Sequence, residues 1–286
     1  MGSNISGTVE EVGDDVTAFQ PGDSVFGLSS FTSPTPYQAG LQEYAILSAS
    51  AVAKTPPAFS HDQVVTLPVN LVTAWLALFG TSNSLGFQVP FFSKEASSFD
   101  YKAKSLIILN AGASNAHFAI QLAALAGIGN IIAVAGLDGK EDLLAMGATH
   151  VLDRHRPVEE LVEDIHDIVG RDRVKHVYQA HGHDYSLATR LLPVDRPSWL
   201  QSVHPIPEDL TASRPFCKAG MIECSNEGLG EYAEEFWTEV PKWLVEGKVR
   251  PGKVGSVVEG LEKVERINGV LDELAEGKGR ECVVHP

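Results

Sequence analysis

The fold class is decided by the stretch Ser105-Leu-Ile-Ile-Leu-Asn-Ala-Gly-Ala-Ser-Asn-Ala-His-Phe-Ala-Ile-Gln-Leu-Ala123. Residues 105–109 are almost wholly apolar and predict a buried strand, and residues 116–126 predict a helix. Residues 110–115, between them, form a tight turn of small side chains. A strand, turn and helix in this order direct the first N–H groups of the helix at an anion, commonly a pyrophosphate. The stretch therefore predicts a βα unit whose turn a phosphate group can approach closely.

Strands and helices alternate after this stretch, and the expected elements are strand 130–135, helix 140–146, strand 151–152, helix 158–169 and strand 174–179. This alternation predicts an α/β fold with a parallel, doubly wound sheet of the Rossmann type. The pattern weakens after Arg190. The last expected elements are helix 231–246, strand 254–258, helix 261–275 and strand 281–284.

The first sixty residues have a different character. Short strands are expected at 5–12, 24–27, 42–47 and 51–54, and turn residues such as Pro21 and Gly22 separate them. Short strands with closely spaced turns favour a small barrel or sandwich. Residues 64–79 have helical spacing, with Pro68 near the start. We therefore expect a β domain of residues 1–62 with 250–286, and a nucleotide-binding-like domain of residues 63–249.

Composition excludes several classes of partner. The chain has 286 residues, and 22 basic against 37 acidic side chains give a net charge of −15. So acidic a surface repels phosphate backbones, which argues against nucleic acid and anionic lipid as partners. The three cysteines are too few for a disulfide framework and indicate an intracellular, cytoplasmic protein. No signal peptide and no uninterrupted apolar run of bilayer length is visible, so we expect no membrane contact.

The turn departs from the dinucleotide fingerprint G-x-G-x-x-G. Ala111, Ala113 and Ala116 stand where that pattern places glycines, and Gly112 is the one glycine of the turn. Each added methyl group narrows the approach to phosphate. The candidate cofactor-binding residues here are Gly112, Ala113, Ser114 and Asn115. The plainer interpretation is a turn that packs well and binds nothing.

The end of the second expected strand bears on the choice of dinucleotide. An acidic residue there holds the ribose diol of NAD, whereas NADP sites place Ser, Lys or Arg near the 2′-phosphate. Asp138 suits a ribose hydroxyl and opposes a 2′-phosphate, and Lys140 partly offsets its charge. A solvated turn between strand and helix explains both residues equally well.

Four stretches together resemble the medium-chain dehydrogenase/reductase superfamily. They are residues 6–13 with 19–27, residues 42–45 through 67–75, residues 105–123 with 144–153, and residues 260–286. The similarity is greatest to the zinc-free branch with quinone reductases and the trans-acting enoyl reductases of fungal polyketide pathways. It implies a Rossmann-type domain, a GroES-like β domain and a reductase that uses a nicotinamide cofactor on a small-molecule substrate.

The resemblance also implies a truncation. The Gly-Thr-Val-Glu-Glu-Val-Gly stretch at residues 7–13 lies well inside the catalytic domain of that family. Measured against the family's length, roughly the first sixty residues of the GroES-like domain are then missing. An opened β domain exposes strand edges, and a homodimer is one way to cover them.

The sequence argues against a zinc site and against tight binding of NADPH. Structural zinc needs four thiolates close together, and catalytic zinc needs three convergent ligands. Cys217, Cys224 and Cys282 are too few and too scattered, so we expect no metal. The enoyl reductase-like members usually carry Ser-Pro-Lys after the second strand, where this chain has Gly136-Leu137-Asp138. We therefore expect NADP or NAD with weakened NADPH affinity, and the absence of any dinucleotide stays open.

Candidate catalytic residues follow the strand expected at 174–179. His181, His183, Asp184 and Tyr185 lie where ligands bind in such sheets, and an imidazole beside a carboxylate can act as a general acid or base. A solvated polar loop is the plainer interpretation. Thr73 matches a family residue that borders the nicotinamide. Candidate substrate-pocket residues are Tyr44, Phe91 and Phe92.

Three functions remain open from the sequence. The first is a zinc-independent NAD(P)H-dependent oxidoreductase, of the enoyl or quinone reductase type, for a small or polyketide-like substrate in secondary metabolism. The second is a redox-neutral cyclase, isomerase or dehydratase on a reductase fold that no longer uses NAD(P)H. The third is a non-catalytic partner of a pathway enzyme. The fold by itself does not choose among them.

Overall fold

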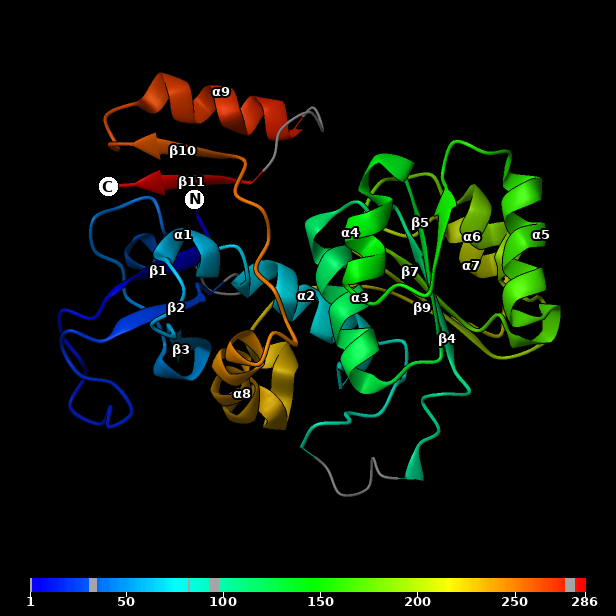
Figure 1. Ribbon diagram of the computed structural model, residues 1–286, viewed down its shortest axis with the longest axis horizontal. Helices are drawn as coiled ribbons and strands as arrows, with labels where there is room; N and C mark the ends of the chain where they lie inside the picture. The colour runs from blue at the N-terminus through cyan, green and yellow to red at the C-terminus, as the bar shows by residue number, and fades with distance from the viewer. Residues whose placement is uncertain (1, 31–34, 82, 93–97, 276–280) are drawn as a thin grey trace. The chain divides into compact units, whose positions relative to one another are not determined.

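The computed structural model describes residues 2–30, 35–81, 83–92, 98–275 and 281–286. The chain divides into two units (Figure 1). The β unit consists of Met1–Val72, Ser225–Glu227 and Glu231–Pro286, and the Rossmann unit of Thr73–Cys224 and Gly228–Gly230. Each unit is described by itself below.

The Rossmann unit contains one six-stranded sheet, in which every neighbouring pair of strands is parallel. Its strand order is β6-β5-β4-β7-β8-β9. The strands are β4 (Ser105–Leu109), β5 (Asn130–Ala135), β6 (His150–Asp153), β7 (His176–Gln179), β8 (Ser198–Ser202) and β9 (Cys217–Met221). The chain runs outward from β4 in one direction and then from β7 in the other. The carboxyl ends of β4 and β7 are therefore the switch point at which such sheets bind ligands.

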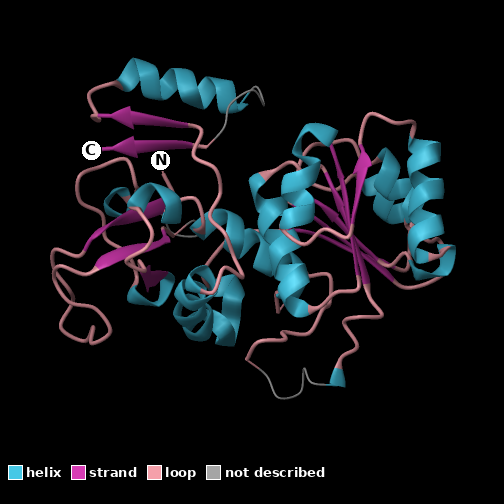
Figure 2. Cartoon of the chain, in the orientation of Figure 1, coloured by secondary structure: helices cyan, strands magenta, loops and turns pink. Residues whose placement is uncertain are grey.

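Helices cover both faces of this sheet, and Figure 2 shows the strands edge-on between two helical layers. The helices are α3 (Ser114–Ala126), α4 (Lys140–Ala145), α5 (Val158–Val169), α6 (Ser186–Leu191) and α7 (Glu208–Ser213). Side chains of α5, α6 and α7 form one apolar core with alternate residues of the sheet, such as Ile107, Val177 and Leu200. The doubly wound Rossmann-type sheet expected from the sequence is confirmed.

Strands β8 and β9 were not among the expected elements. The sequence Ser198-Trp-Leu-Gln-Ser202 has polar residues at three of five positions. In the structure, Ser198, Gln201 and Ser202 are all buried, because β8 lies between two other strands. A buried strand rich in polar side chains does not produce the apolar run by which central strands are found in a sequence.

The β unit contains two small sheets. Strands β1 (Asn4–Thr8), β2 (Ser24–Leu28) and β3 (Val52–Lys54) are antiparallel in the order β1-β2-β3. Strands β10 (Ser256–Glu259) and β11 (Cys282–His285) form a parallel pair, with α9 (Val264–Ala275) between them in sequence. The strand expected at 42–47 is wrong. That segment is irregular, and its Ile46 N–H donates to the carbonyl of Tyr37 rather than to a strand.

The helix expected at 64–79 is two helices, α1 (His61–Val64) and α2 (Pro68–Phe79). Ser60 caps α1, since its hydroxyl accepts from Gln63 N–H and Gln63 Oε1 accepts from Ser60 N–H. Pro68 takes the first position of α2, where its missing N–H costs nothing. Residues 61–79 satisfy the length and composition test for a membrane-crossing helix, which the sequence expectation did not foresee, and most of the segment is buried in the structure.

The boundary between the two units differs from the expected one, which divides the chain between residues 62 and 63 and between residues 249 and 250. Helix α8 (Ala233–Val245) belongs to the β unit, because it packs against β3 and the short turn Ala49–Ala51. The ring of Trp237 lies edge-on to Phe26, with centroids 6.3 Å apart. Its indole N–H donates to Asn226 Oδ1 at 2.8 Å, which ties residues 225–227 to the same unit.

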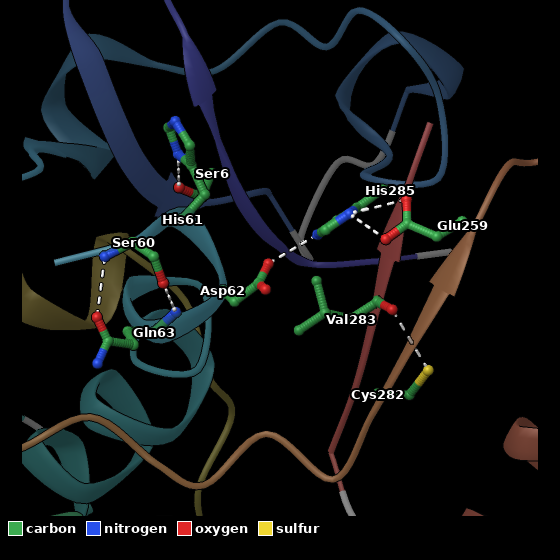
Figure 3. Close-up of polar contacts among 9 residues, drawn as sticks. All are labelled: Ser6, Ser60, His61, Asp62, Gln63, Glu259, Cys282, Val283 and His285. Atoms are coloured by element: carbon green, nitrogen blue, oxygen red, sulfur yellow. Dashed lines mark hydrogen bonds and ion pairs between the residues drawn. The ribbon is translucent and has the colours of Figure 1, made fainter.

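Polar contacts join β11 to α1 and β10 (Figure 3). His285 Nε2 lies 2.7 Å from Asp62 Oδ1, and Nδ1 lies 3.0 and 3.1 Å from the two carboxylate oxygens of Glu259. A neutral imidazole donates through one nitrogen only, so two facing carboxylates favour the imidazolium. The hydrogen bond to Asp62, above all, raises the pKa of His285, and the bond to Glu259 adds to it.

Replacing His285 with glutamine is expected to remove a pH-dependent part of the stability of the β unit. Because the pKa of His285 is raised in the folded chain, its contribution is fully present below the unfolded value near 6.5 and is lost as pH rises through the folded pKa. A half-exposed pair of this kind contributes about 1 kcal/mol or less. Thermal melts from pH 5.5 to 9 should show a Tm difference between the parent chain and His285→Gln of about 2–4 °C at acid pH. A difference that grows toward alkaline pH would contradict this.

Candidate functional site at the carboxyl ends of the sheet

The turn between β4 and α3 has room for an anion. A Cβ placed on Gly112 would meet no atom within 4 Å. No side chain caps α3 at Ala113, and no acidic residue lies in its first turn. The side chains of Ala111 and Ala116 are fully buried, so their methyl groups pack into the core. Two of the three alanines therefore do not narrow the approach to the first N–H groups of α3.

Two asparagines join this turn to the loop after β7. Asn110 has a left-handed backbone (φ 55°), and its Nδ2 donates to the carbonyl of His181 at 2.6 Å. Asn115 Nδ2 donates to the carbonyl of Ala180 at 3.1 Å. Asn115 Oδ1 is buried and has no hydrogen-bond partner within the described part of the chain. Asn115, which the sequence predicts to bind the cofactor, thus uses its Nδ2 donor to hold the two loops together. Ser114, beside it, is half-buried.

The carboxyl end of β5 carries charges of both signs. Asp138 lies in the short turn Leu137–Gly139, and a Cβ on Gly136 would lie only 2.7 Å from its Oδ1. The Asp138 carboxylate therefore lies close to the backbone at the end of β5. Dinucleotide-binding folds place the acidic residue that binds a ribose in this region. Lys140 follows as the first residue of α4, exposed.

Arg154 is a residue that the sequence interpretation missed. Its N–H donates to the carbonyl of Ala135 at 2.9 Å, which places it beside the end of β5. The side chain is exposed and makes no ion pair with any residue described, whereas the nearby Arg156 binds both Glu160 and Asp164. It was missed because it follows β6 in the sequence, and only the pairing of β5 with β6 brings it to the same edge.

Three imidazoles meet at the carboxyl ends of β7 and β8. The ring centroid of His204 lies 4.3 Å from that of His183 and 5.3 Å from that of His181. His204 Nε2 is buried without a hydrogen-bond partner among the described residues. Partial burial, then the charges of His183 and His181, lower the pKa of His204. Imidazoles that adjoin one another can pass a proton. His204 was missed because it lies in the segment after Arg190, where the sequence pattern weakens.

Asp184 and Tyr185 have structural partners. Asp184 Oδ1 accepts from Ser186 N–H at 2.9 Å, at the start of α6, and this bond lowers the pKa of the carboxyl. The Tyr185 hydroxyl is buried and lies 2.7 Å from Ser202 Oγ, with the carbonyls of His204 and Pro205 at 3.1 and 3.2 Å. Tyr185 therefore holds the loop that carries His204, and its hydroxyl has no free side for a substrate.

The remaining candidates lie elsewhere in the two units. Thr73 is buried on α2 and hydrogen-bonds the Cys224 thiol, whose pKa burial raises to about 11. The rings of Phe91 and Phe92 lie 5.8 and 5.6 Å from the buried ring of Trp75, so that α2 supplies the packing partner this loop pair needs. Tyr44 belongs to the β unit, where it is exposed.

No group of three or more His, Cys, Asp or Glu side chains is arranged to hold a metal ion in the described ranges. The three cysteines lie apart in the sequence, in β9, after β9 and in β11, and none forms a disulfide.

Comparison with known proteins places these features in a family. Residues 1–57 match the family model for the alcohol dehydrogenase GroES-like domain, and residues 116–193 match the model for zinc-binding dehydrogenases. The mitochondrial NAD(P)H oxidoreductase RTN4IP1 of Mus musculus is 33% identical over 153 residues, which is 54% of this chain and 34% of that protein. The chain thus spans about a third of that relative's length.

Solved structures share the fold. The crystal structure of CurK enoyl reductase superposes with a TM-score of 0.72 at 19% identity, over 99% of this chain and 78% of that one. A mycobacterial protein complexed with NADPH superposes with a TM-score of 0.71 at 18% identity, over 100% and 82%. The two family models, the sheet order and these neighbours agree: the chain is a member of the medium-chain dehydrogenase/reductase superfamily.

Proposed function

We propose that the chain is a zinc-independent reductase that binds NAD(P)H at the carboxyl ends of β4 and β5. The observation that carries the proposal is the uncapped start of α3 beside the open space at Gly112. A helix start without a capping side chain leaves N–H groups available to a pyrophosphate. The name of the mouse relative, an NAD(P)H oxidoreductase, supports a nicotinamide cofactor.

A bound nicotinamide cofactor would supply the hydride for reduction of a carbon–carbon or carbonyl double bond. The residues of this chain bind and orient. The first N–H groups of α3 hold the pyrophosphate, and Asp138 accepts hydrogen bonds from a ribose. The rings of His183 and His204 adjoin at the ends of the neighbouring strands, but the reductase does not depend on them, because solvent can supply the proton to the reduced substrate. We propose a small or polyketide-like molecule of secondary metabolism as the substrate, and a cytoplasmic location.

Fluorescence titration of the 286-residue chain with NADPH and then NADH tests the cofactor proposal. Saturable binding at micromolar concentration, about −8 kcal/mol in free energy, is the expected result. A folded sample that binds neither dinucleotide would contradict the reductase and favour the redox-neutral alternative.

The balance between Asp138 and Arg154 is expected to set the preference between the two dinucleotides. Removing the carboxylate with Asp138→Ala should tighten NADPH relative to NADH, because repulsion of the 2′-phosphate is lost. Removing the unpaired guanidinium with Arg154→Ala should do the reverse. Each shift should be about tenfold in the ratio of Kd values, since a charged hydrogen bond contributes about 1.5 kcal/mol or more. Arg156→Ala is a matched control, because Arg156 is already paired. Shifts of equal sign for Asp138→Ala and Arg154→Ala would contradict the assignment.

The imidazole cluster favours a second candidate, a redox-neutral cyclase, isomerase or dehydratase. His204 Nε2 is buried and unsatisfied within the described residues, and His183 adjoins it, which suits proton transfer to and from a substrate. Under this candidate, His204→Gln and His183→Ala lose turnover by about 100-fold or more, whereas changes at the turn of α3 leave it intact. Under the reductase, His181→Ala and His183→Ala keep most of the activity.

A further inference from the structure

The carboxyl ends of β5 and β6 bring an imidazole close to the carboxylate of Asp138. His155 follows β6 by two residues, and β6 pairs in parallel with β5. A Cβ placed on Gly136 would lie 2.7 Å from Asp138 Oδ1 and 4.0 Å from His155 Cε1. The carboxylate and the ring therefore lie on the same side of the Gly136 backbone, the side on which any other residue would carry its side chain.

One nitrogen of the His155 ring is held by a carboxylate. Nδ1 lies 2.9 Å from Asp153 Oδ1, and the same oxygen accepts from His155 N–H at 3.1 Å. The bond from this N–H, above all, lowers the pKa of the Asp153 carboxyl, which is therefore an ionised acceptor at neutral pH. The hydrogen bond that one ring nitrogen makes decides which nitrogen carries the proton of a neutral imidazole. In the neutral ring, Nδ1 therefore carries the proton and Nε2 does not.

The other nitrogen, Nε2, is the one that changes with pH. It makes no hydrogen bond to any residue that the structure describes, and the His155 side chain is 67% exposed. In the neutral ring Nε2 has only a lone pair, so it cannot donate to an anion. In the imidazolium it carries an N–H, and the ring is positively charged. Because imidazoles change charge between about pH 5 and 8, Nε2 alternates between an acceptor and a charged donor in that range.

Charged side chains of both signs surround this ring. The turn Leu137–Gly139 and helix α4 pack against β6. The charged residues of these elements and of the segment that carries the ring are Asp138, Lys140, Glu141, Asp142, Asp153, Arg154 and Arg156. Arg156 is engaged by Glu160 and Asp164, whereas Asp138 makes no ion pair within the described ranges. Asp138 is therefore a carboxylate whose charge a protonated His155 offsets.

We propose that His155 sets the preference between the two dinucleotides through its protonation, an inference that rests on the proposed function because that places the adenosine ribose at Asp138. The imidazolium donates from Nε2 to the 2′-phosphate of NADPH, a charge-assisted bond, and offsets the repulsion of this phosphate by Asp138. The neutral ring does neither, and Asp138 then favours the ribose diol of NADH. The preference for NADPH over NADH therefore rises as pH falls.

The test measures the Kd of NADPH and of NADH by fluorescence titration at pH 6.5 and 8.5. It compares the 286-residue chain with His155→Gln, which keeps a neutral donor, and with His150→Gln. His150 is a matched control, because it lies at the amino end of β6, where its Nδ1 is 2.9 Å from Thr149 Oγ1. For the parent chain and His150→Gln, the ratio of the NADH Kd to the NADPH Kd should be about threefold to tenfold higher at pH 6.5. For His155→Gln it should change less than about twofold.

The comparison between chains isolates the imidazole from the ligand's own titration. The second ionisation of a phosphate ester lies near pH 6, so protonation of the 2′-phosphate weakens NADPH at acid pH in all three chains alike. A ratio that changes with pH as much in His155→Gln as in the parent chain overturns the role of His155 and leaves the reductase standing. A folded parent chain that binds neither dinucleotide overturns the reductase, and this inference with it. Circular dichroism checks that both variants are folded.

Discussion

Replacing Gly112 with tryptophan is expected to abolish binding of NADPH and NADH while the Rossmann unit stays folded. The space beside Gly112 holds no protein atom within 4 Å of an added Cβ, so the indole fills solvent at the turn and does not disturb the core. A pyrophosphate then loses at least two charge-assisted bonds to the start of α3, each worth about 1.5–3 kcal/mol. The loss in affinity should be about 100-fold or greater, measured by fluorescence titration.

Gly112→Ala is the matched control for this experiment. One methyl group meets no protein atom, so the expected loss in dinucleotide affinity is far smaller than for tryptophan. Turnover by Gly112→Trp at the level of the parent chain would contradict the reductase. Combined with inactive His183→Ala and His204→Gln variants, that result would assign the chemistry to the imidazole cluster.

Replacing Tyr185 with phenylalanine is expected to destabilise the Rossmann unit by about 1–3 kcal/mol, because Ser202 Oγ and the carbonyls of His204 and Pro205 lose a buried partner. This corresponds to a fall in Tm of about 2–4 °C for each kcal/mol. Turnover below the melting range should change by less than about tenfold, since the hydroxyl is already engaged by Ser202 and by the loop that carries His204. A phenylalanine variant of unchanged Tm that lost activity by about 1000-fold would show that Tyr185 acts as a proton donor.

The comparison of sequence with structure separates two kinds of residue in the site. Gly112, Asp138 and Lys140 can be proposed from the sequence because they lie at fixed distances along the chain from a strand that the sequence marks clearly. Arg154 and His204 were not found, because each enters the site by strand pairing. Asn115 and Tyr185 were identified as functional candidates, but in the structure the Nδ2 group of Asn115 and the hydroxyl of Tyr185 bind neighbouring loops. A sequence shows which side chains can donate or accept, and only the packed neighbours show which of them are already engaged.

The sequence by itself determined the alternating β4-α3-β5 core, the parallel sheet and the turn at residues 110–115, because these depend on local periodicity and on small residues at close spacing. The tertiary structure alone decided the rest. It turned residues 198–202, which are rich in polar side chains, and residues 217–221 into strands, since neighbouring strands of the sheet satisfy their backbones. It assigned α8 to the β unit through contacts with residues distant in sequence.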